Sequence, residues 1–168
     1  FNLNFVRVDA GGTGIVPHVD ALTQALRRCL HAVESRLDAY AHPLTGILDR
    51  VHFDVPHAHT CAAGRDYLAI DTQGRTAPCQ MLLDHPWGSM TEAAPLDALR
   101  AKGASRFGVP VDDRPDCASC LWRYACAGGC PLLRKTPIHD RYCRVYRMML
   151  PEVMALEGRR LLTRWMAA

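Results

Sequence analysis

The chain has 168 residues, of which 49% are hydrophobic, so it is long enough for one compact domain or two small ones with a buried core. Its formal net charge of +3 is too small to predict nucleic-acid binding. No apolar run approaches the roughly 20 residues that a membrane-spanning helix needs, and no signal-peptide pattern opens the chain. We therefore expect no nucleic-acid partner, no membrane partner and a cytoplasmic location.

The first third of the sequence, residues 1–53, has the pattern of a strand followed by helices. Residues 2–8 alternate between apolar and polar, and a glycine-rich turn follows them. Over residues 17–40 the apolar positions recur every three or four residues, which predicts an amphipathic helix. A further short helix is allowed at 44–52. Because the sequence opens at Phe1 inside a strand pattern, we expect it to be the C-terminal part of a longer protein.

A β-hairpin is predicted in the middle of the chain. Its strands are residues 67–70 and 75–79, and Asp71–Gly74 forms the turn, with Gly at the position where φ is positive. A hairpin is rigid where a loop is not, so it would hold Cys79 at a fixed offset from Cys61.

The remaining elements are short until the C-terminal region. Residues 85–88 predict a turn, residues 96–101 a short helix, and residues 107–115 an extended connector with two prolines. From Tyr142 the chain is expected to be helical to its end. Pro151 interrupts this pattern, which predicts a kink or two separate helices.

Seven of the eight cysteines form one dense arrangement. Four fall within the 14 residues from Cys117 to Cys130, spaced CxxC, then five residues, then CxxxC; the full set is Cys61, Cys79, Cys117, Cys120, Cys126, Cys130 and Cys143. Such close spacings direct several thiolates toward one shared point, which favours metal binding over disulfides and fits a reducing compartment. The eighth, Cys29, lies on the apolar stripe of the N-terminal helix, where a small buried hydrophobe is expected.

The residues around these cysteines favour iron–sulfur over zinc. Structural zinc sites commonly use two CxxC pairs, and this chain has one such pair and a CxxxC. Cysteine ligands of iron–sulfur clusters are often followed by proline, as in Cys130-Pro131. The small residues Ala127–Gly129 would let backbone amides approach cluster sulfides. Zinc sites, one or two, remain an alternative at this point.

The order and spacing of the seven cysteines resemble the signature of the SPASM domain. Cys61 is followed after twelve residues by Gly74 and after four more by Cys79, and the other five cysteines continue the same pattern. The SPASM domain is the C-terminal auxiliary-cluster domain of radical S-adenosylmethionine enzymes that mature peptides and proteins. The resemblance implies an α+β chain: a SPASM domain at 54–168, with a hairpin, Cys-rich loops and terminal helices. The last strand and helix of a partial radical-SAM (β/α) barrel would precede it at 1–53.

The resemblance also implies two auxiliary [4Fe–4S] clusters and their ligands. One cluster would be held by Cys117, Cys120, Cys126 and Cys143, and the other by Cys61, Cys79 and Cys130. Seven thiolates leave one of eight positions without a cysteine. We expect an open iron there, or Cys29, His57 or His59 as the eighth ligand.

The expected function follows from the same resemblance. The CxxxCxxC loop that binds a third [4Fe–4S] cluster and S-adenosylmethionine in this family is absent. The third cluster and S-adenosylmethionine would therefore bind to the upstream barrel, in a missing N-terminal part of the same protein. The sequence alone is expected to hold no catalytic residue and to be inactive. Its substrate would be a peptide or protein, and a peptide-crosslinking maturase is favoured. Sulfatase-maturing relatives carry Asp after the second signature cysteine; Gln80 stands here and cannot accept a proton at neutral pH, so that activity is an alternative.

Two further readings come from other functional classes. A non-enzymatic zinc-binding interaction module would use the same thiolates as structural ligands. An electron-transfer protein similar to a ferredoxin would bind clusters without any upstream barrel.

Overall fold

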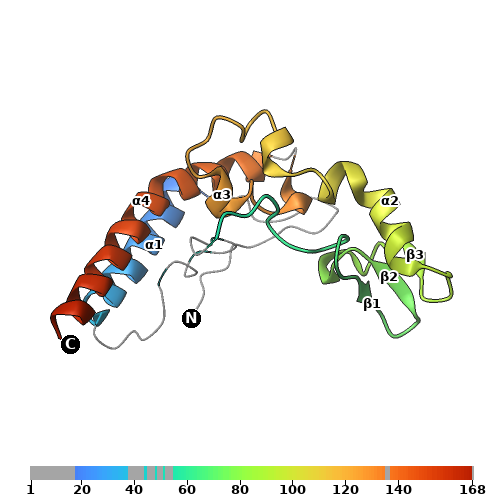
Figure 1. The fold of residues 1–168 in the computed structure, drawn as a ribbon, viewed down its shortest axis with the longest axis horizontal. Helices are drawn as coiled ribbons and strands as arrows, with labels where there is room; N and C mark the ends of the chain where they lie inside the picture. Colours follow the sequence, from blue (N-terminus) through green and yellow to red (C-terminus); the bar gives the residue numbers. More distant parts are fainter. Residues whose placement is uncertain are drawn as a thin grey trace.

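The computed structural model describes residues 18–37, 44, 48, 51, 55–134 and 137–167. The molecule is elongated: a pair of long helices lies at one end, a small sheet with one helix at the other, and the Cys-rich segment between them (Figure 1). The described residues thus combine helices with strands. The predicted strand at 2–8 and the glycine-rich turn after it lie outside the described residues. None of the helices in the described part is long and apolar enough to cross a membrane.

The predicted N-terminal amphipathic helix is present as α1 (Val19–Glu34). Its apolar stripe is buried, at Val19, Leu26, Leu30 and Val33, together with Thr23. The helix ends earlier than the pattern predicted, because Ser35 and the residue after it form a turn. The Ser35 hydroxyl donates to a carbonyl of the last helical turn at 2.9 Å, which caps the exposed end. Of the predicted barrel remnant, α1 is the element that the structure describes.

The C-terminal region is one helix, α4 (Pro137–Met166), and the division into two helices is wrong. It begins five residues before Tyr142, because proline is well suited to the first turn of a helix, where its missing N–H is not needed. Pro151 lies inside α4 on its exposed side. Pro151 lacks the N–H that would bond the carbonyl one turn earlier, and the helix continues through it without that bond.

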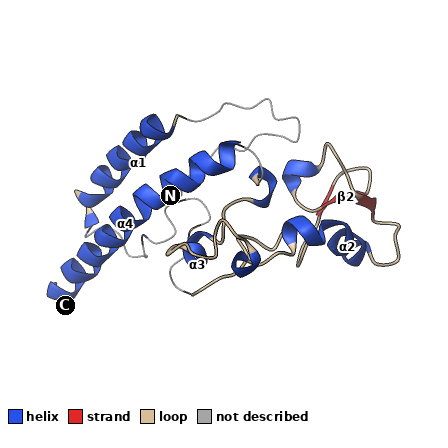
Figure 2. Ribbon diagram, turned by 90° about the horizontal axis from the view of Figure 1, so that it is seen from above, coloured by secondary structure: helices blue, strands red, loops and turns tan. Residues whose placement is uncertain are grey.

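Helices α1 and α4 lie side by side and run in the same direction (Figure 2). Arg27 of α1 donates to Glu152 of α4 at 2.7 Å, and Arg159 of α4 approaches Glu34 of α1 at 2.9 Å. Both pairs have the same offset in residue number, as expected for two parallel helices. Between them lies the larger hydrophobic core, which also takes in single residues of the loops. Its members are Val19, Leu26, Leu30, Val33, Leu37, Leu44, Leu48, Val51, Leu133, Tyr142, Val145, Tyr146, Met149, Leu150, Val153 and Leu156.

The predicted hairpin is confirmed at the other end of the molecule. Strand β1 (Ala69–Ile70) pairs with β2 (Arg75–Ala77) in antiparallel fashion, and Gly74 in the turn has φ of +74°. The Asp71 carboxylate accepts hydrogen bonds from two backbone amides of the turn, each at 2.9 Å. A third strand, β3 (Gly88–Ser89), pairs with β2 where the sequence predicted only a turn.

Helix α2 (Pro95–Phe107) packs near the sheet and is longer than the predicted helix at 96–101. It takes the first residue of the predicted connector, Phe107, into its last turn, because that ring is buried against a second, smaller core. The Phe107 ring meets Trp87 edge to face at 5.8 Å between centroids. The buried members of this core are Ala63, Ala77, Cys79, Leu82 and Phe107.

An ion pair within α4 also holds the backbone at Leu44. Arg160 donates to both oxygens of the buried Glu157 carboxylate, at 2.8 and 2.6 Å, and the Leu44 amide donates to it at 2.8 Å. Hydrogen bonding from Arg160 lowers the pKa of Glu157, although burial opposes the shift. A lowered carboxyl pKa stabilises the fold above the unfolded-state value near 4.5, and this contribution is lost as the pH falls through the folded-state pKa.

We expect Glu157→Gln to lower the free energy of unfolding by about 2 kcal/mol at pH 7, because it removes charged hydrogen bonds in a buried site. Chemical denaturation at several pH values measures this, and the difference from the parent protein should shrink below about pH 4.5. The matched control is Glu152→Gln, which removes the exposed partner of Arg27 and should change stability by less than about 1 kcal/mol. Equal losses in the two variants would contradict the role assigned to Glu157.

Candidate metal centre

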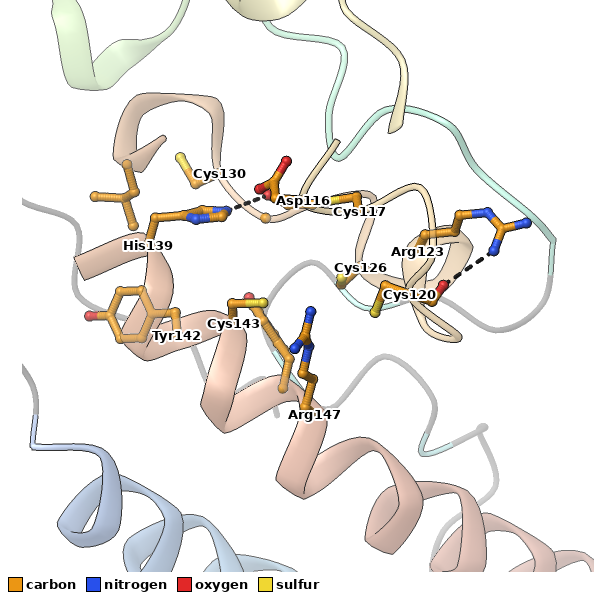
Figure 3. A pocket seen from close by; sticks show the side chains of 14 residues that line it. Asp116, Cys117, Cys120, Arg123, Cys126, Cys130, His139, Tyr142, Cys143 and Arg147 are labelled. Atoms are coloured by element: carbon orange, nitrogen blue, oxygen red, sulfur yellow. Dashed lines mark hydrogen bonds between the residues drawn. The ribbon is translucent and has the colours of Figure 1, made fainter. Parts of the chain in front are cut away.

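Five cysteines line one hollow between α4 and the segment that contains the short helix α3 (Arg123–Cys126) (Figure 3). They are Cys117, Cys120, Cys126, Cys130 and Cys143. The sulfur of Cys143 projects from α4 toward the loop that carries the others, and Arg147 projects from the next turn of the same helix. Loop and helix therefore present their thiols to one space, although these cysteines span 27 positions of the sequence.

Cys117 is buried, the other four cysteines of this hollow are half-buried, and the thiols lie close enough to influence one another's pKa values. Burial raises the pKa of Cys126 to about 11 from a reference of 9.0, which disfavours the free thiolate by roughly 3 kcal/mol. Negative charge on Cys117, Cys143 and Cys120 raises it further. Burial also raises the pKa values of Cys117 and Cys143. The mutual influence therefore joins the four cysteines that the resemblance assigns to one cluster, and a metal must displace their protons to bind.

A second hollow is lined by Cys61, Cys79 and Cys130. Cys79 directly follows the hairpin, two residues after β2, and both Cys61 and Cys79 contact the smaller hydrophobic core. Cys130 contacts the larger core and lines both hollows. The three cysteines that the resemblance assigns to the second cluster thus share one space, next to the first.

A left-handed turn connects the two hollows. Ala127, Gly128 and Gly129 have φ values of +45°, +75° and +70°. Three successive residues thus lie in the left-handed backbone region, which residues with a side chain rarely adopt. The buried hydroxyl of Thr60 lies 2.9 Å from the Ala127 carbonyl and 2.7 Å from the Gly129 carbonyl. The amide of Gly128 donates in the other direction, to the Cys126 sulfur, and lowers its pKa. The small residues therefore bring a backbone amide to the Cys126 thiol, and the expected approach of amides to cluster sulfides stays a prediction.

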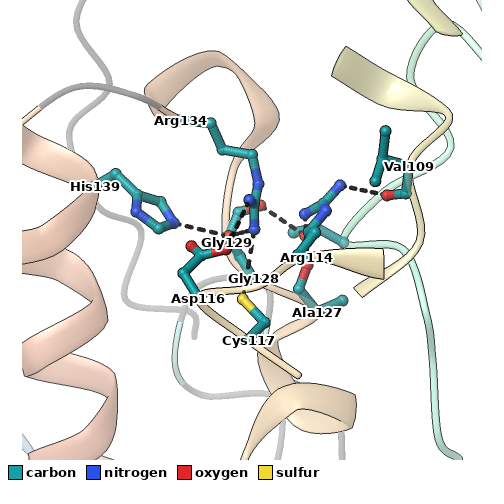
Figure 4. A network of polar contacts seen from close by, with 10 residues as sticks. Val109, Arg114, Asp116, Cys117, Ala127, Gly128, Gly129, Arg134 and His139 are labelled. Carbon is teal, nitrogen blue, oxygen red and sulfur yellow. Dashed lines mark hydrogen bonds and ion pairs between the residues drawn. The ribbon is translucent and has the colours of Figure 1, made fainter. Parts of the chain in front are cut away.

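Two arginines that the sequence analysis did not identify hold the same turn (Figure 4). Arg114 is only 4% exposed and donates to the Ala127 carbonyl at 3.2 Å. Arg134 donates to the Gly128 carbonyl at 2.9 Å and lies 3.6 Å from the Cys117 sulfur. The Nε2 atom of His139 lies 3.1 Å from the same carbonyl. No spacing rule marks these residues, because their contacts depend on the fold of the turn.

None of the three proposed eighth ligands lines the second hollow. Cys29 lies on α1 and is half-buried, a weaker burial than its apolar position predicted. His57 and His59 belong to the loop before Cys61, and burial lowers the pKa of His59. The non-cysteine side chains at the second hollow include Tyr67, Gln80 and Met81. The identity of the eighth ligand therefore stays a prediction.

The eight cysteines are all free thiols. Within the described ranges, no three side chains of His, Cys, Asp or Glu lie close enough together to hold a single metal ion. The signature thiols instead surround two adjoining hollows. The thiols of each hollow therefore suit a group of several atoms that would lie inside that hollow and be ligated from several sides. Thiolate donors of this kind bind iron–sulfur clusters and zinc.

Comparison with known proteins gives one relative. No family model matches the chain, and no solved structure matches it. Over 99 residues the chain is 25% identical to a serine-type anaerobic sulfatase-maturating enzyme of Klebsiella pneumoniae. The match covers 58% of this chain and 25% of the relative, so the chain spans about a quarter of the relative's length. The similarity supports a relationship to maturating enzymes.

We expect Gly128→Ala to destabilise the protein more than Gly74→Ala does. Both glycines have φ near +75°, so each alanine costs about 1 to 2 kcal/mol of backbone strain. A Cβ on Gly74 would meet nothing within 4 Å, whereas one on Gly128 would collide with Arg134 and lie 3.1 Å from the Cys117 sulfur. Denaturation should show an additional loss of about 2 kcal/mol for Gly128→Ala, the value of hydrogen bonds to a charged group. Equal losses would contradict the close approach.

Proposed function

We propose that this chain is the C-terminal, cluster-binding part of a radical S-adenosylmethionine enzyme that modifies a peptide or protein. It would hold two auxiliary [4Fe–4S] clusters, one in each cysteine-lined hollow. Clusters of this kind supply electron transfer or a binding point for substrate. The upstream barrel, with S-adenosylmethionine and a third cluster, would belong to the remainder of the protein.

The division of the seven signature cysteines between two hollows carries this proposal. Cys117, Cys120, Cys126 and Cys143 line the first hollow, and Cys61, Cys79 and Cys130 line the second. The resemblance implies two ligand sets that interleave along the chain, and the lining of the two hollows supports this assignment except that Cys130 also lines the first hollow. Cys130 lies at both hollows, and we assign it to the second because the four other thiols already supply the ligands that one cluster takes.

The surroundings of the hollows also favour a bound cofactor. Each hollow adjoins a hydrophobic core, which keeps water away from a group whose potential depends on burial. The raised thiol pKa values mean that the metal-free site holds protons rather than free thiolates, and metal binding would release them. The chain's own residues would thus orient the ligands, exclude water and donate hydrogen bonds to sulfur.

A peptide-crosslinking maturase is our favoured activity for the whole protein. The similarity to a sulfatase-maturating enzyme favours the alternative that the substrate is a sulfatase. Against that alternative, Gln80 occupies the position after Cys79 where sulfatase-maturing relatives carry Asp. Gln80 is exposed and lines the second hollow, so its side chain stands where the Asp of those relatives would face the same hollow. An amide cannot serve as the base.

We expect anaerobically reconstituted protein to be brown and to contain about eight irons per chain, the content of two [4Fe–4S] clusters. Cys126→Ala should remove the cluster of the first hollow and leave about four irons, and Cys79→Ala should remove the other. The matched control is Cys29→Ala, a cysteine on α1 outside both hollows, which should keep all the iron. Metal analysis and visible absorption measure each outcome. A colourless protein with stoichiometric zinc would instead support the zinc-binding interaction module.

We also expect the gene to encode a CxxxCxxC motif upstream of Phe1, within the same reading frame. That motif would supply three thiolates to the cluster that binds S-adenosylmethionine, and it separates the enzyme from an electron-transfer protein similar to a ferredoxin. Reading the gene upstream provides the measurement. A complete open reading frame without the motif would support the ferredoxin-like alternative.

A further inference from the structure

The buried guanidinium of Arg114 and the half-buried guanidinium of Arg134 meet at the turn between the hollows. A Cβ built on Gly128 would lie 3.0 Å from Arg114 Nη1 and 3.1 Å from the Cys117 sulfur, and would collide with Arg134. All three groups therefore converge on one point of the backbone (Figure 4). Arg134 keeps 16% of its side chain exposed and also approaches Asp116 at 3.7 Å. Arg114, at 4% exposed, has carbonyl partners at Ala127 and Val109.

Placing two like charges together in a protein interior is unfavourable unless a negative charge offsets them. Burial lowers the pKa of Arg114, and the charge of Arg134 lowers it further. Negative charge on Cys117, Asp116 and Cys61 acts in the opposite direction. Two of these groups are thiols that line different hollows, Cys117 the first and Cys61 the second. Arg114 also bonds the Ala127 carbonyl, which lies one residue after Cys126 of the first hollow and three residues before Cys130, which lines the second.

A [4Fe–4S] group held by thiolates carries net negative charge, and each added electron makes it more negative. Nearby cations stabilise the reduced form relative to the oxidised form, so net charge and hydrogen bonds to sulfur set the reduction potential. The effect of a cation is largest where burial excludes water, because screening is weak there. The positions of Arg114 and Arg134 meet both conditions.

We infer that Arg114 and Arg134 are positioning residues that set the reduction potentials of the two auxiliary clusters, with Arg134 acting on the first and Arg114 on both. This inference rests on the proposed function. Arg134 would act through its contact with the Cys117 sulfur, and Arg114 through the backbone turn between Cys126 and Cys130.

A simpler role for both residues is structural, since each donates to a carbonyl of the turn. Thr60 provides the matched comparison, because its hydroxyl bonds to carbonyls of the same turn and carries no charge. Thr60→Val removes those hydrogen bonds at nearly constant shape. Arg134→Gln and Arg114→Gln keep an amide donor and remove the positive charge.

The experiment is a redox titration of the anaerobically reconstituted protein, followed by electron paramagnetic resonance. The signals of the two clusters are assigned with Cys126→Ala and Cys79→Ala. Arg134→Gln should shift the first cluster to a lower potential and leave the second unchanged. Arg114→Gln should lower both potentials. Arg134→Lys should largely preserve the parent potential, because it keeps the charge.

Two controls separate charge at the site from other effects. Thr60→Val should lower stability without shifting either potential. Arg75→Gln removes the same charge from the exposed hairpin and should shift neither potential.

Unchanged potentials in both arginine variants with full iron content would overturn the inference and leave the proposed function standing. Shifts of equal size in Thr60→Val would overturn it in favour of a structural role. A parent protein without iron–sulfur clusters would overturn the proposed function and this inference together.

Discussion

The backbone turn from Ala127 to Gly129 is the constraint on which the rest of the structure depends. Gly128 and Gly129 adopt positive φ readily, whereas Ala127 keeps its φ of +45° only while surrounding contacts hold it. The buried hydroxyl of Thr60 and the guanidinium groups of Arg114 and Arg134 bond carbonyls of this turn. The Gly128 amide donates to the Cys126 sulfur. The turn lies between Cys126 and Cys130; both of these cysteines line the first hollow, and Cys130 also lines the second.

The two hydrophobic cores explain why the hollows lie where they do. The larger core is built by the parallel pair α1 and α4, and Cys126 and Cys130 pack against its edge. The smaller core is built by the sheet and α2, and it contains Cys79 with Cys61 beside it. Neither core alone holds all seven thiols. The Cys-rich segment spans the space between them, so packing of the cores draws the two sets of thiols into adjoining sites.

Burial and charge oppose each other throughout this region. Removing thiols from water raises their pKa values, and removing arginines from water destabilises their charged form. The charged form of each group is thus unfavourable in isolation, and a thiolate and a guanidinium would stabilise each other when they are close together. Shifted pKa values gathered in one hollow mark a candidate functional site.

The sequence by itself determined the elements whose pattern is local. The apolar periodicity of α1, the hairpin with Gly74 at its turn, and the spacing of the seven cysteines could all be read along the chain, because each depends on neighbours within a few residues. Only the tertiary structure decided that β3 joins the sheet, that α4 continues through the exposed Pro151, and that Arg114 and Arg134 meet at Gly128. Those outcomes depend on contacts between segments far apart in the chain, and on which side of each element faces water, neither of which leaves a periodic signal in the sequence.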